Sequence, residues 1–323
     1  AITDVVAAKP RTVPNIIFDA QPGAGLDTVA FTLNAGILNI RSVYDLDGVD
    51  NVSNLNPGYA DIASIADPGQ ATSTDRPARF LRIVKGVSIP DDDTKMIPGT
   101  AFGAGAQQSM REIVGYVPIQ PDGSVRAYVP ANVPVAISVV DGNGRRISAR
   151  HQNWLQFRPG EEVTCSGCHD HGSGTPHAHP EAPPSAYPGA PASGFPNTLL
   201  RDVPGYLGIP NDPVPVAINF QESMADTITR ALPQTLVPSI DLVYDDYWTD
   251  INSLQQDAST TLGYAALTTP MPQTAACSPW TSLCRSIIHY ETHIHPLWSV
   301  SRGAAGANTC TNCHNAAAPA AEL

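Results

Sequence analysis

The sequence predicts a mainly β fold, with a β-sandwich-like N-terminal part, an irregular middle and a small, mostly α C-terminal part. Pro and Gly fill 31 and 25 of the 323 positions, which excludes a coiled coil or long helical bundle because proline clashes in helix interiors. The chain is 42% hydrophobic and 15% charged, a near-globular composition that disfavours wholesale disorder. Short apolar runs between turn residues fill residues 1–150, as in a sandwich or small barrel.

The predicted strands follow one another at short intervals. They cover residues 15–18, 29–33, 37–44, 78–84, 112–117, 125–129 and 133–140. Asp122-Gly123 lies between two alternating apolar runs and predicts a hairpin, and Asp141-Gly142 follows the last run in the same way. We therefore expect a β-sandwich-like domain over residues 1–150.

The composition and periodicity of the sequence change after residue 150. Residues 171–213 are crowded with Pro, Gly, Ala and Ser and show no periodicity, which indicates a long irregular segment. Helix-like stretches follow at 221–232 and 283–295. We expect an irregular segment over residues 151–215 and a second small domain over residues 216–323.

The net charge of −12 argues against a nucleic-acid partner, which needs a basic footprint. The longest apolar run, residues 133–140, has the length of a strand, so no membrane span is expected. The sequence begins at Ala1 without an initiator Met or a basic-then-apolar leader. An exported chain whose leader has been removed explains this start, and a trimmed piece is the alternative.

Two five-residue motifs indicate the chemistry. They are Cys165-Ser166-Gly167-Cys168-His169 and Cys310-Thr311-Asn312-Cys313-His314. Both have the C-x-x-C-H pattern of c-type haem attachment, in which two thiols reach the two vinyl groups of a porphyrin and the adjacent imidazole binds iron. The sequence therefore predicts two covalently bound haem c groups with His169 and His314 as proximal ligands, and a cytochrome c-like C-terminal part.

A single zinc site built from all four cysteines is the competing interpretation. Zinc ribbons place their cysteine pairs some 15–20 residues apart, whereas Cys165 and Cys310 are separated by 145 positions. A zinc site also gives no reason for a His directly after each pair. Haem is the better interpretation of both motifs.

Covalent haem attachment takes place outside the cytoplasm, so we expect a periplasmic or extracellular, cell-surface location. The other two cysteines, Cys277 and Cys284, are expected to form a disulfide there. Two buried free thiols are the alternative.

The distal ligands come from the remaining histidines. His177 and His179 are close enough in sequence to loop back to the first haem, and His151 can reach it from upstream. No Met follows His314, so the second haem needs a ligand from upstream or from another chain. His289 and His293 share one helix face at spacing i, i+4, and either is a candidate.

Two further groups of residues have either a functional or a purely structural interpretation. Arg158, near Trp154, is a candidate partner for haem propionates, or else a structural arginine. Calcium is a weaker prediction at four oxygen-bearing residues that also suit a simple polar turn: Asp45, Asp47, Asp50 and Asn51.

Several stretches resemble one known family. Gly115–Ile119, Asp122-Gly123-Ser124 and Trp154–Glu161, running into the first motif, resemble the haem-bearing middle domain of the hydrazine synthase alpha subunit family. Tyr290–Trp298 followed by the second motif resembles the C-terminal haem domain of that family. The resemblance covers residues 79–169 and 285–315, and implies bis-His ligation with His293 as the distal ligand of the second haem.

The sequence departs from that family in two ways. Nothing repeats at the length of a β-propeller blade. Asp170-His171-Gly172-Ser173 stands where the family has a Tyr shortly after its catalytic motif, so hydrazine chemistry is not implied.

The leading hypothesis is a dihaem cytochrome that carries electrons between other c-type cytochromes or redox proteins. Assembly as a subunit of a homo-oligomer or filament is a further hypothesis. A haem redox enzyme with an open coordination site at the first haem is the alternative. A β-rich module stapled by zinc is a third.

Overall fold

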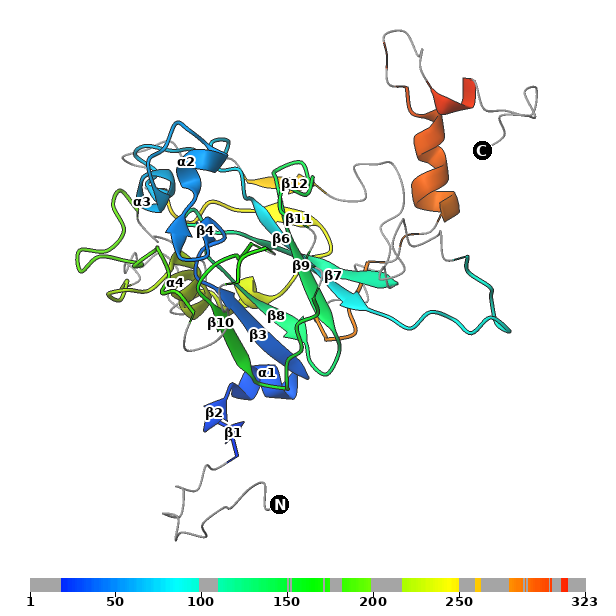
Figure 1. The fold of residues 1–323 in the computed structure, drawn as a ribbon, viewed down its shortest axis with the longest axis horizontal. Helices are drawn as coiled ribbons and strands as arrows, with labels where there is room; N and C mark the ends of the chain where they lie inside the picture. Colours follow the sequence, from blue (N-terminus) through cyan, green and yellow to red (C-terminus); the bar gives the residue numbers. More distant parts are fainter. Residues whose placement is uncertain are drawn as a thin grey trace, which may run out of the picture.

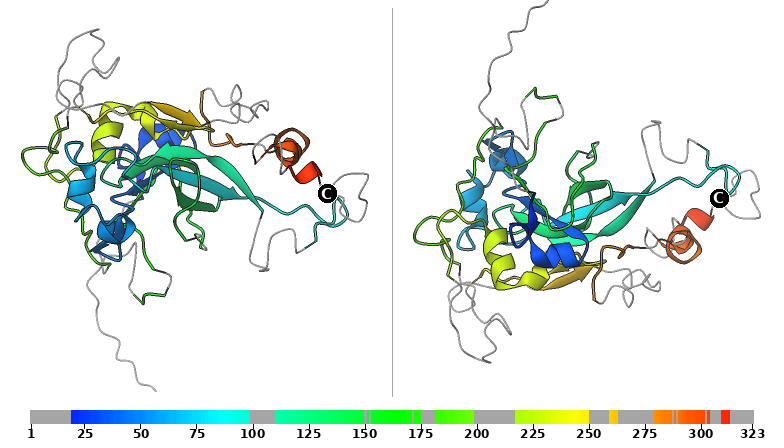
Figure 2. Two further views of the ribbon diagram at one scale, coloured as in Figure 1. Left: turned by 90° about the horizontal axis from the view of Figure 1, so that it is seen from above. Right: turned by 90° about the horizontal axis from the view of Figure 1, so that it is seen from below.

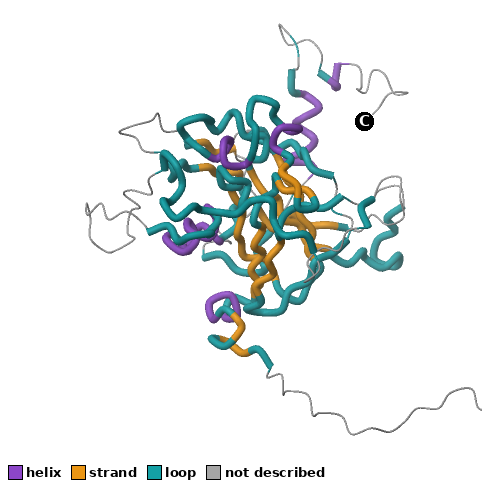
Figure 3. Tube along the Cα trace, turned by 60° about the vertical axis from the view of Figure 1, so that its left-hand side comes forward, coloured by secondary structure: helices purple, strands orange, loops and turns teal. Residues whose placement is uncertain are grey.

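The computed structural model describes thirteen stretches of the chain. They are residues 19–98, 110–149, 151, 153–170, 172–174, 182–198, 217–249, 259–262, 279–286, 288, 290–301, 303 and 309–312. Strands occupy the centre of the molecule and loops and short helices surround them (Figure 3). The mainly β fold predicted from the sequence is confirmed.

Two three-stranded sheets form the body (Figure 1). The first has the order β10 (Glu162–Cys165), β3 (Ala35–Ile40), β8 (Val125–Pro130), and the second has the order β7 (Arg111–Pro118), β6 (Phe80–Gly86), β9 (Val135–Val140). β10 runs parallel to β3, and every other pairing in the two sheets is antiparallel.

One apolar core joins the two sheets, as a sandwich-like arrangement requires. Its side chains are fully or almost fully buried. In β3, Leu38 and Ile40 enter this core, whereas Ile37, on the opposite face of the strand, belongs to a second buried cluster. Members from the first sheet include Leu38 and Ala127, and members from the second include Leu81, Val117 and Val139.

The α4 helix (Met224–Ala231) packs against β8, and its Met224 and Ile228 belong to the same core. Phe157 belongs to it as well. Residues on both sides of positions 150 and 215 therefore share one core, and the division of the chain at those positions stays a prediction.

The remaining elements are short. They are β1 (Gln21–Pro22), β2 (Gly25–Leu26), α1 (Thr28–Thr32), β4 (Asp45–Leu46), β5 (Val49–Asp50), α2 (Val52–Leu55), α3 (Ile62–Ala66), η2 (Pro233–Leu236), β11 (Leu242–Tyr244), β12 (Thr260–Leu262), the π-helical turn η5 (Tyr290–Ile294), η6 (His295–Ser299) and η8 (Cys310–Asn312). The segment containing η5 and η6, drawn in orange, lies off one end of the body, away from the middle of the sheets (Figure 2).

Two local predictions are wrong. Residues 29–33 form most of α1 instead of a strand, because Asp27 caps the helix by accepting a hydrogen bond from the amide of Ala30. Asp122-Gly123 makes a tight turn but no hairpin, because the strands on either side pair in different sheets. The predicted strand at residues 15–18 lies outside the described residues.

Among the described residues, no helix has both the length and the apolar character needed to cross a bilayer.

Candidate functional site

The first C-x-x-C-H motif begins at the end of a strand. Cys165 is the last residue of β10 and pairs with Ile40 of β3. Its carbonyl accepts a hydrogen bond of 2.9 Å from the amide of Arg41. The central sheet thereby fixes the direction in which the motif leaves the core.

The other end of the motif is held by the β4 turn. The amide of Cys168 donates to the carbonyl of Asp45 at 2.8 Å, and the Cys168 carbonyl accepts from the amide of Asp47 at 3.0 Å. A Cβ atom on Gly167 would lie 2.5 Å from Cβ of Asp45, closer than real contacts allow. Glycine at this position permits the close approach of the two segments.

The Asp45 carboxylate connects the motif to the segment at residues 182–190. It accepts hydrogen bonds from the amide of Ala186 at 2.7 Å and from the hydroxyl of Ser185 at 2.9 Å. The same hydroxyl lies 3.2 Å from the carbonyl of Ser166, inside the motif. Part of the irregular segment therefore crosses directly beside the motif.

The two cysteines of the first motif are free thiols, not joined to each other. Burial raises the pKa of Cys165, and burial together with the neighbouring Asp45 and Cys165 raises the pKa of Cys168 to about 11. Raised pKa values favour the protonated form of both thiols. His169 follows them and is exposed. This set of two thiols and an adjacent imidazole fits the donors that covalent haem requires.

His151 is the predicted distal candidate that the structure places near the motif. Its Nδ1 is buried and has no hydrogen-bond partner among the residues described. Burial lowers the pKa of His151, the nearby His169 and Arg111 lower it further, and a backbone hydrogen bond at Asn153 raises it. A metal-bound histidine is commonly anchored in this way, with one nitrogen on the backbone and the other left for the metal.

The two residues predicted to bind haem propionates, Arg158 and Trp154, each have a contact within the protein. Arg158 is exposed, and its guanidinium lies 3.3 Å from Oε1 of Glu161, so its observed contact is a local ion pair. Trp154 packs under the guanidinium of Arg111, 4.5 Å from the ring centroid. Arg111 is not predicted from the sequence, because no sequence pattern relates it to Trp154, which lies 43 positions away.

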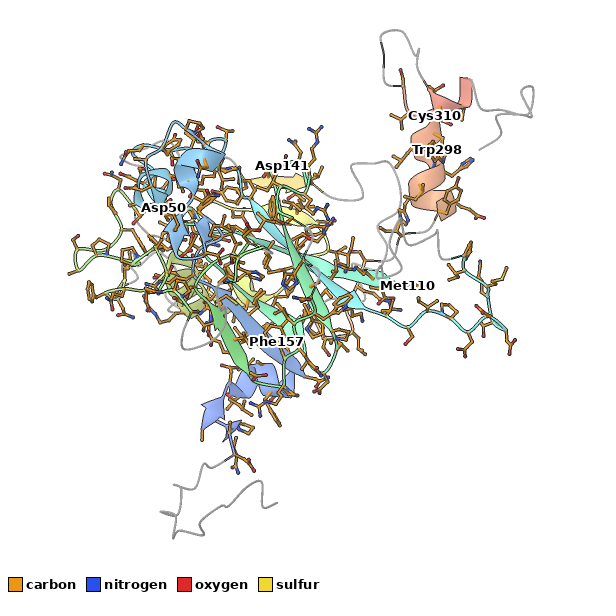
Figure 4. The ribbon with its side chains drawn as sticks, in the orientation of Figure 1. Asp50, Met110, Asp141, Phe157, Trp298 and Cys310 are labelled. Carbon is orange, nitrogen blue, oxygen red and sulfur yellow. The ribbon has the colours of Figure 1, made fainter. Side chains whose placement is uncertain are left out.

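The second motif is described only in part. Cys310 begins η8, which contacts η6, and Cys310 and Trp298 lie close together in Figure 4. His293 lies in η5 and is 4% exposed, whereas His295 is exposed. The indole Nε1 of Trp298 donates to the hydroxyl of Tyr290 at 3.2 Å, joining η6 to η5.

Several predicted residues lie outside the described part of the chain, and their roles stay predictions. They are Cys313, His314, His289, His177, His179 and Cys277. Cys284 is described: it is a buried free thiol, 4% exposed, and its sulfur accepts from the amide of Thr281 at 3.3 Å. The predicted disulfide with Cys277 is not formed in this structure.

The residues considered as calcium ligands accept hydrogen bonds from other protein groups instead. Asp50, labelled in Figure 4, accepts hydrogen bonds from the amides of Val52 and Ile62, at 3.0 and 2.7 Å. Asp47 accepts from the amide of Asp170 at 3.1 Å, and Asn51 from the side chain of Asn54. In the described part of the chain, no three His, Cys, Asp or Glu side chains gather as a metal site.

A comparison with protein families bears on the region that contains the first motif. Residues 78–170 match the model of the hydrazine synthase alpha subunit middle domain. The match confirms a relation to that family over the segment where the sequence resembles it. The corresponding resemblance of residues 285–315 stays a prediction.

The middle-domain match covers the second sheet, β8 and β10, and it ends one residue after His169. β3, β4 and α4, which complete the body, lie outside it. Of the motif's neighbours, His151 lies inside the matched segment, whereas Asp45 and Ser185 lie outside it.

The solved structure of Kuenenia stuttgartiensis hydrazine synthase aligns with 42% of this chain at 19% identity, with a TM-score of 0.30. The alignment spans 17% of that chain. No curated protein matches this chain.

Proposed function

We propose that this chain is a dihaem c-type cytochrome that carries electrons between redox partners outside the cytoplasm. The observation that supports this best is the arrangement at the first motif. Two free thiols and the imidazole of His169 stand on one short loop, near the buried and unpartnered Nδ1 of His151. These are the donors needed to attach haem c through two thioethers and to bind its iron on both faces.

At the first site, Cys165 and Cys168 would hold the porphyrin, His169 would be the proximal ligand and His151 the distal one. His177 and His179 are the alternative distal ligands. When bound, haem c supplies a one-electron couple, and two imidazole ligands suit electron transfer rather than binding of small ligands. The protein itself fixes the loop at both ends, through β10 and through the backbone of Asp45 and Asp47.

At the second site, Cys310 and Cys313 would hold the haem and His314 would be the proximal ligand. His293 is the favoured distal ligand, because it is buried in a π-helical turn, a feature frequent at functional sites. His289 is the alternative. Replacing His293 with Ala is expected to make one haem bind carbon monoxide, with the exposed His295→Ala variant as the control.

Haem stoichiometry tests the proposal directly. The intact mass of the denatured protein is expected to include two macrocycles, and the band on a denaturing gel is expected to stain for peroxidase activity. The double variant Cys165→Ser, Cys168→Ser is expected to lose one macrocycle. A colourless protein whose mass equals that of the polypeptide would contradict the proposal and favour a zinc-stapled module.

A haem redox enzyme is the second candidate, favoured by the match of residues 78–170 to a domain of a synthase subunit. An enzyme needs an open coordination site at the first haem, whereas an electron carrier does not. Carbon monoxide added to the reduced protein separates the two functions. Binding to one of two haems supports the enzyme, and a spectrum that does not change supports electron transfer.

Other c-type cytochromes or redox proteins are the proposed partners, and a homo-oligomer or filament with shared ligands is a further possibility for the assembly. Ligands shared between chains predict that dilution to the monomer removes a low-spin haem signal. A spectrum independent of dilution argues for ligands from one chain.

A further inference from the structure

Asp45 makes two separate contacts beside the first motif. Its backbone carbonyl accepts from the amide of Cys168, and its carboxylate accepts from Ser185 and Ala186 of the crossing segment. The residue is 1% exposed. One buried aspartate therefore joins three parts of the chain that are far apart in sequence: the β4 turn, the motif and the segment at residues 182–190.

We propose that Asp45 is the positioning residue of the first haem, fixing the attachment loop and holding a negative charge beside it. This inference rests on the proposed function, because it assigns Asp45 a role toward the haem of that site. No sequence pattern connects Asp45 with a cysteine 123 positions away.

Three hydrogen bonds hold the carboxylate of Asp45. Oδ1 accepts from the amide of Gly48 at 2.8 Å, and Oδ2 accepts from the amide of Ala186 and the hydroxyl of Ser185. Three donors therefore converge on two oxygens. The three hydrogen bonds also orient the side chain, so the charge has a fixed position.

The position of Gly167 shows how closely Asp45 packs against the attachment loop. A Cβ atom at this position would lie 2.8 Å from Cγ of Asp45 and 2.7 Å from its carbonyl oxygen. The carboxylate therefore lies against the peptide between the two attachment cysteines. A side chain at position 167 would push the loop away from it.

A fixed negative charge near an iron centre stabilises the ferric state, because that state carries one more positive charge than the ferrous state. Removing the charge of Asp45 is therefore expected to raise the midpoint potential of the first haem. We expect the ratio of ferrous to ferric haem at a fixed ambient potential to rise three- to tenfold, and tenfold corresponds to about 59 mV for one electron.

Asp67 offers a matched control. It is also buried, at 6% exposure, and its carboxylate also accepts three hydrogen bonds, from Gly69, Gln70 and Asn197. Asn197 belongs to the same irregular segment as Ser185. Asp67 thus tethers that segment as Asp45 does, but it makes none of these contacts with the motif.

The experiment is a spectroelectrochemical titration of the full-length holoprotein, with the haem content of each variant measured by mass. Asp45→Asn is expected to retain two haems and to shift one of the two midpoint potentials upward. Asp67→Asn is expected to shift neither. Asp45→Glu, which restores the charge, is expected to return the potential toward that of the wild type.

Unchanged potentials in Asp45→Asn, with both haems attached, would overturn the role of Asp45 and leave the proposed function intact. A wild-type protein without covalent haem would overturn both. If Asp45→Asn does not accumulate, Ser185→Ala serves instead, because it removes one donor and leaves the charge less compensated. It is expected to lower one potential, and unchanged potentials there would equally overturn the inference.

Discussion

The carboxylate of Asp122 accepts a hydrogen bond of 2.8 Å from the amide of Met224, the first residue of α4. The turn after β7 thereby caps a helix that follows 102 positions later. Asp122 is fully buried and also accepts from the amide and hydroxyl of Ser124 and from the hydroxyl of Tyr187. Tyr187 follows Ala186, so the segment beside the motif is tied to this buried carboxylate as well.

Replacing Asp122 with Ala is expected to lower the free energy of unfolding by about 2–4 kcal/mol, because it leaves several buried donors without an acceptor. Chemical denaturation followed by circular dichroism measures the change. Asp141→Ala is the control: this carboxylate accepts from two turn amides but is not buried, and we expect a loss under about 1 kcal/mol. Equal losses in the two variants would contradict the prediction.

Replacing Gly36 with Ala is expected to destabilise the protein by about 1–3 kcal/mol through overpacking. An added Cβ would lie 2.5 Å from Cβ of Phe157, a buried core residue labelled in Figure 4. Gly174→Ala is the matched control, since no atom lies within 4 Å of the added carbon there. A thermal melt that drops for Gly36→Ala alone confirms the prediction; two unchanged melting temperatures contradict it.

Stability is expected to depend on Glu222 in acid. Although burial raises the pKa of Glu222, hydrogen bonds from Arg230 and Asn219 outweigh it and lower the pKa to about 2. Because its pKa is lowered in the folded protein, Glu222 stabilises the folded state at pH values above 4.5, the ordinary pKa of glutamate. This stabilisation is lost as the pH falls toward 2.

The free energy of unfolding of Glu222→Gln, followed from pH 5 to 2, is therefore expected to fall less steeply than that of the wild type. Asp92→Asn, at an exposed position, serves as the control. Parallel curves for the wild type and Glu222→Gln would show that this carboxylate is not linked to folding.

Replacing His151 with Ala is expected to open the first haem site. The reduced wild type is expected to bind no carbon monoxide, and the variant is expected to bind one molecule per chain, seen as a shift in the absorption spectrum. The exposed His295→Ala is the control. Binding equal to that of the wild type would exclude His151 as a distal ligand and favour His177 or His179.

The strands of the second sheet, and β8 of the first, could be predicted from sequence with small errors at their ends. Apolar alternation depends only on residues two positions apart, and it identified β6, β7, β8 and β9. The same alternation was misleading at residues 29–33, where the side chain of Asp27 caps a helix. It also could not show that β8 pairs with β3 instead of β7, because alternation defines the faces of a strand and not its neighbours.

For the site, the prediction of haem attachment depends only on the spacing of Cys165, Cys168 and His169, which are neighbours in sequence. The propionate role of Arg158 rested on its nearness in sequence, and the structure places it with Glu161. The contacts of Arg111, Ser185 and Asp45 at the site could not be predicted, since each residue reaches the site from a distant element.

By itself, the sequence determined what depends on neighbouring residues: the two attachment motifs, the alternating strands and the irregular texture after residue 150. Only the tertiary structure decided which strands share a sheet and that Asp45 lies against Gly167. The physical reason is that such contacts are selected by packing of the common core, where segments more than a hundred positions apart compete for the same buried surface and hydrogen bonds.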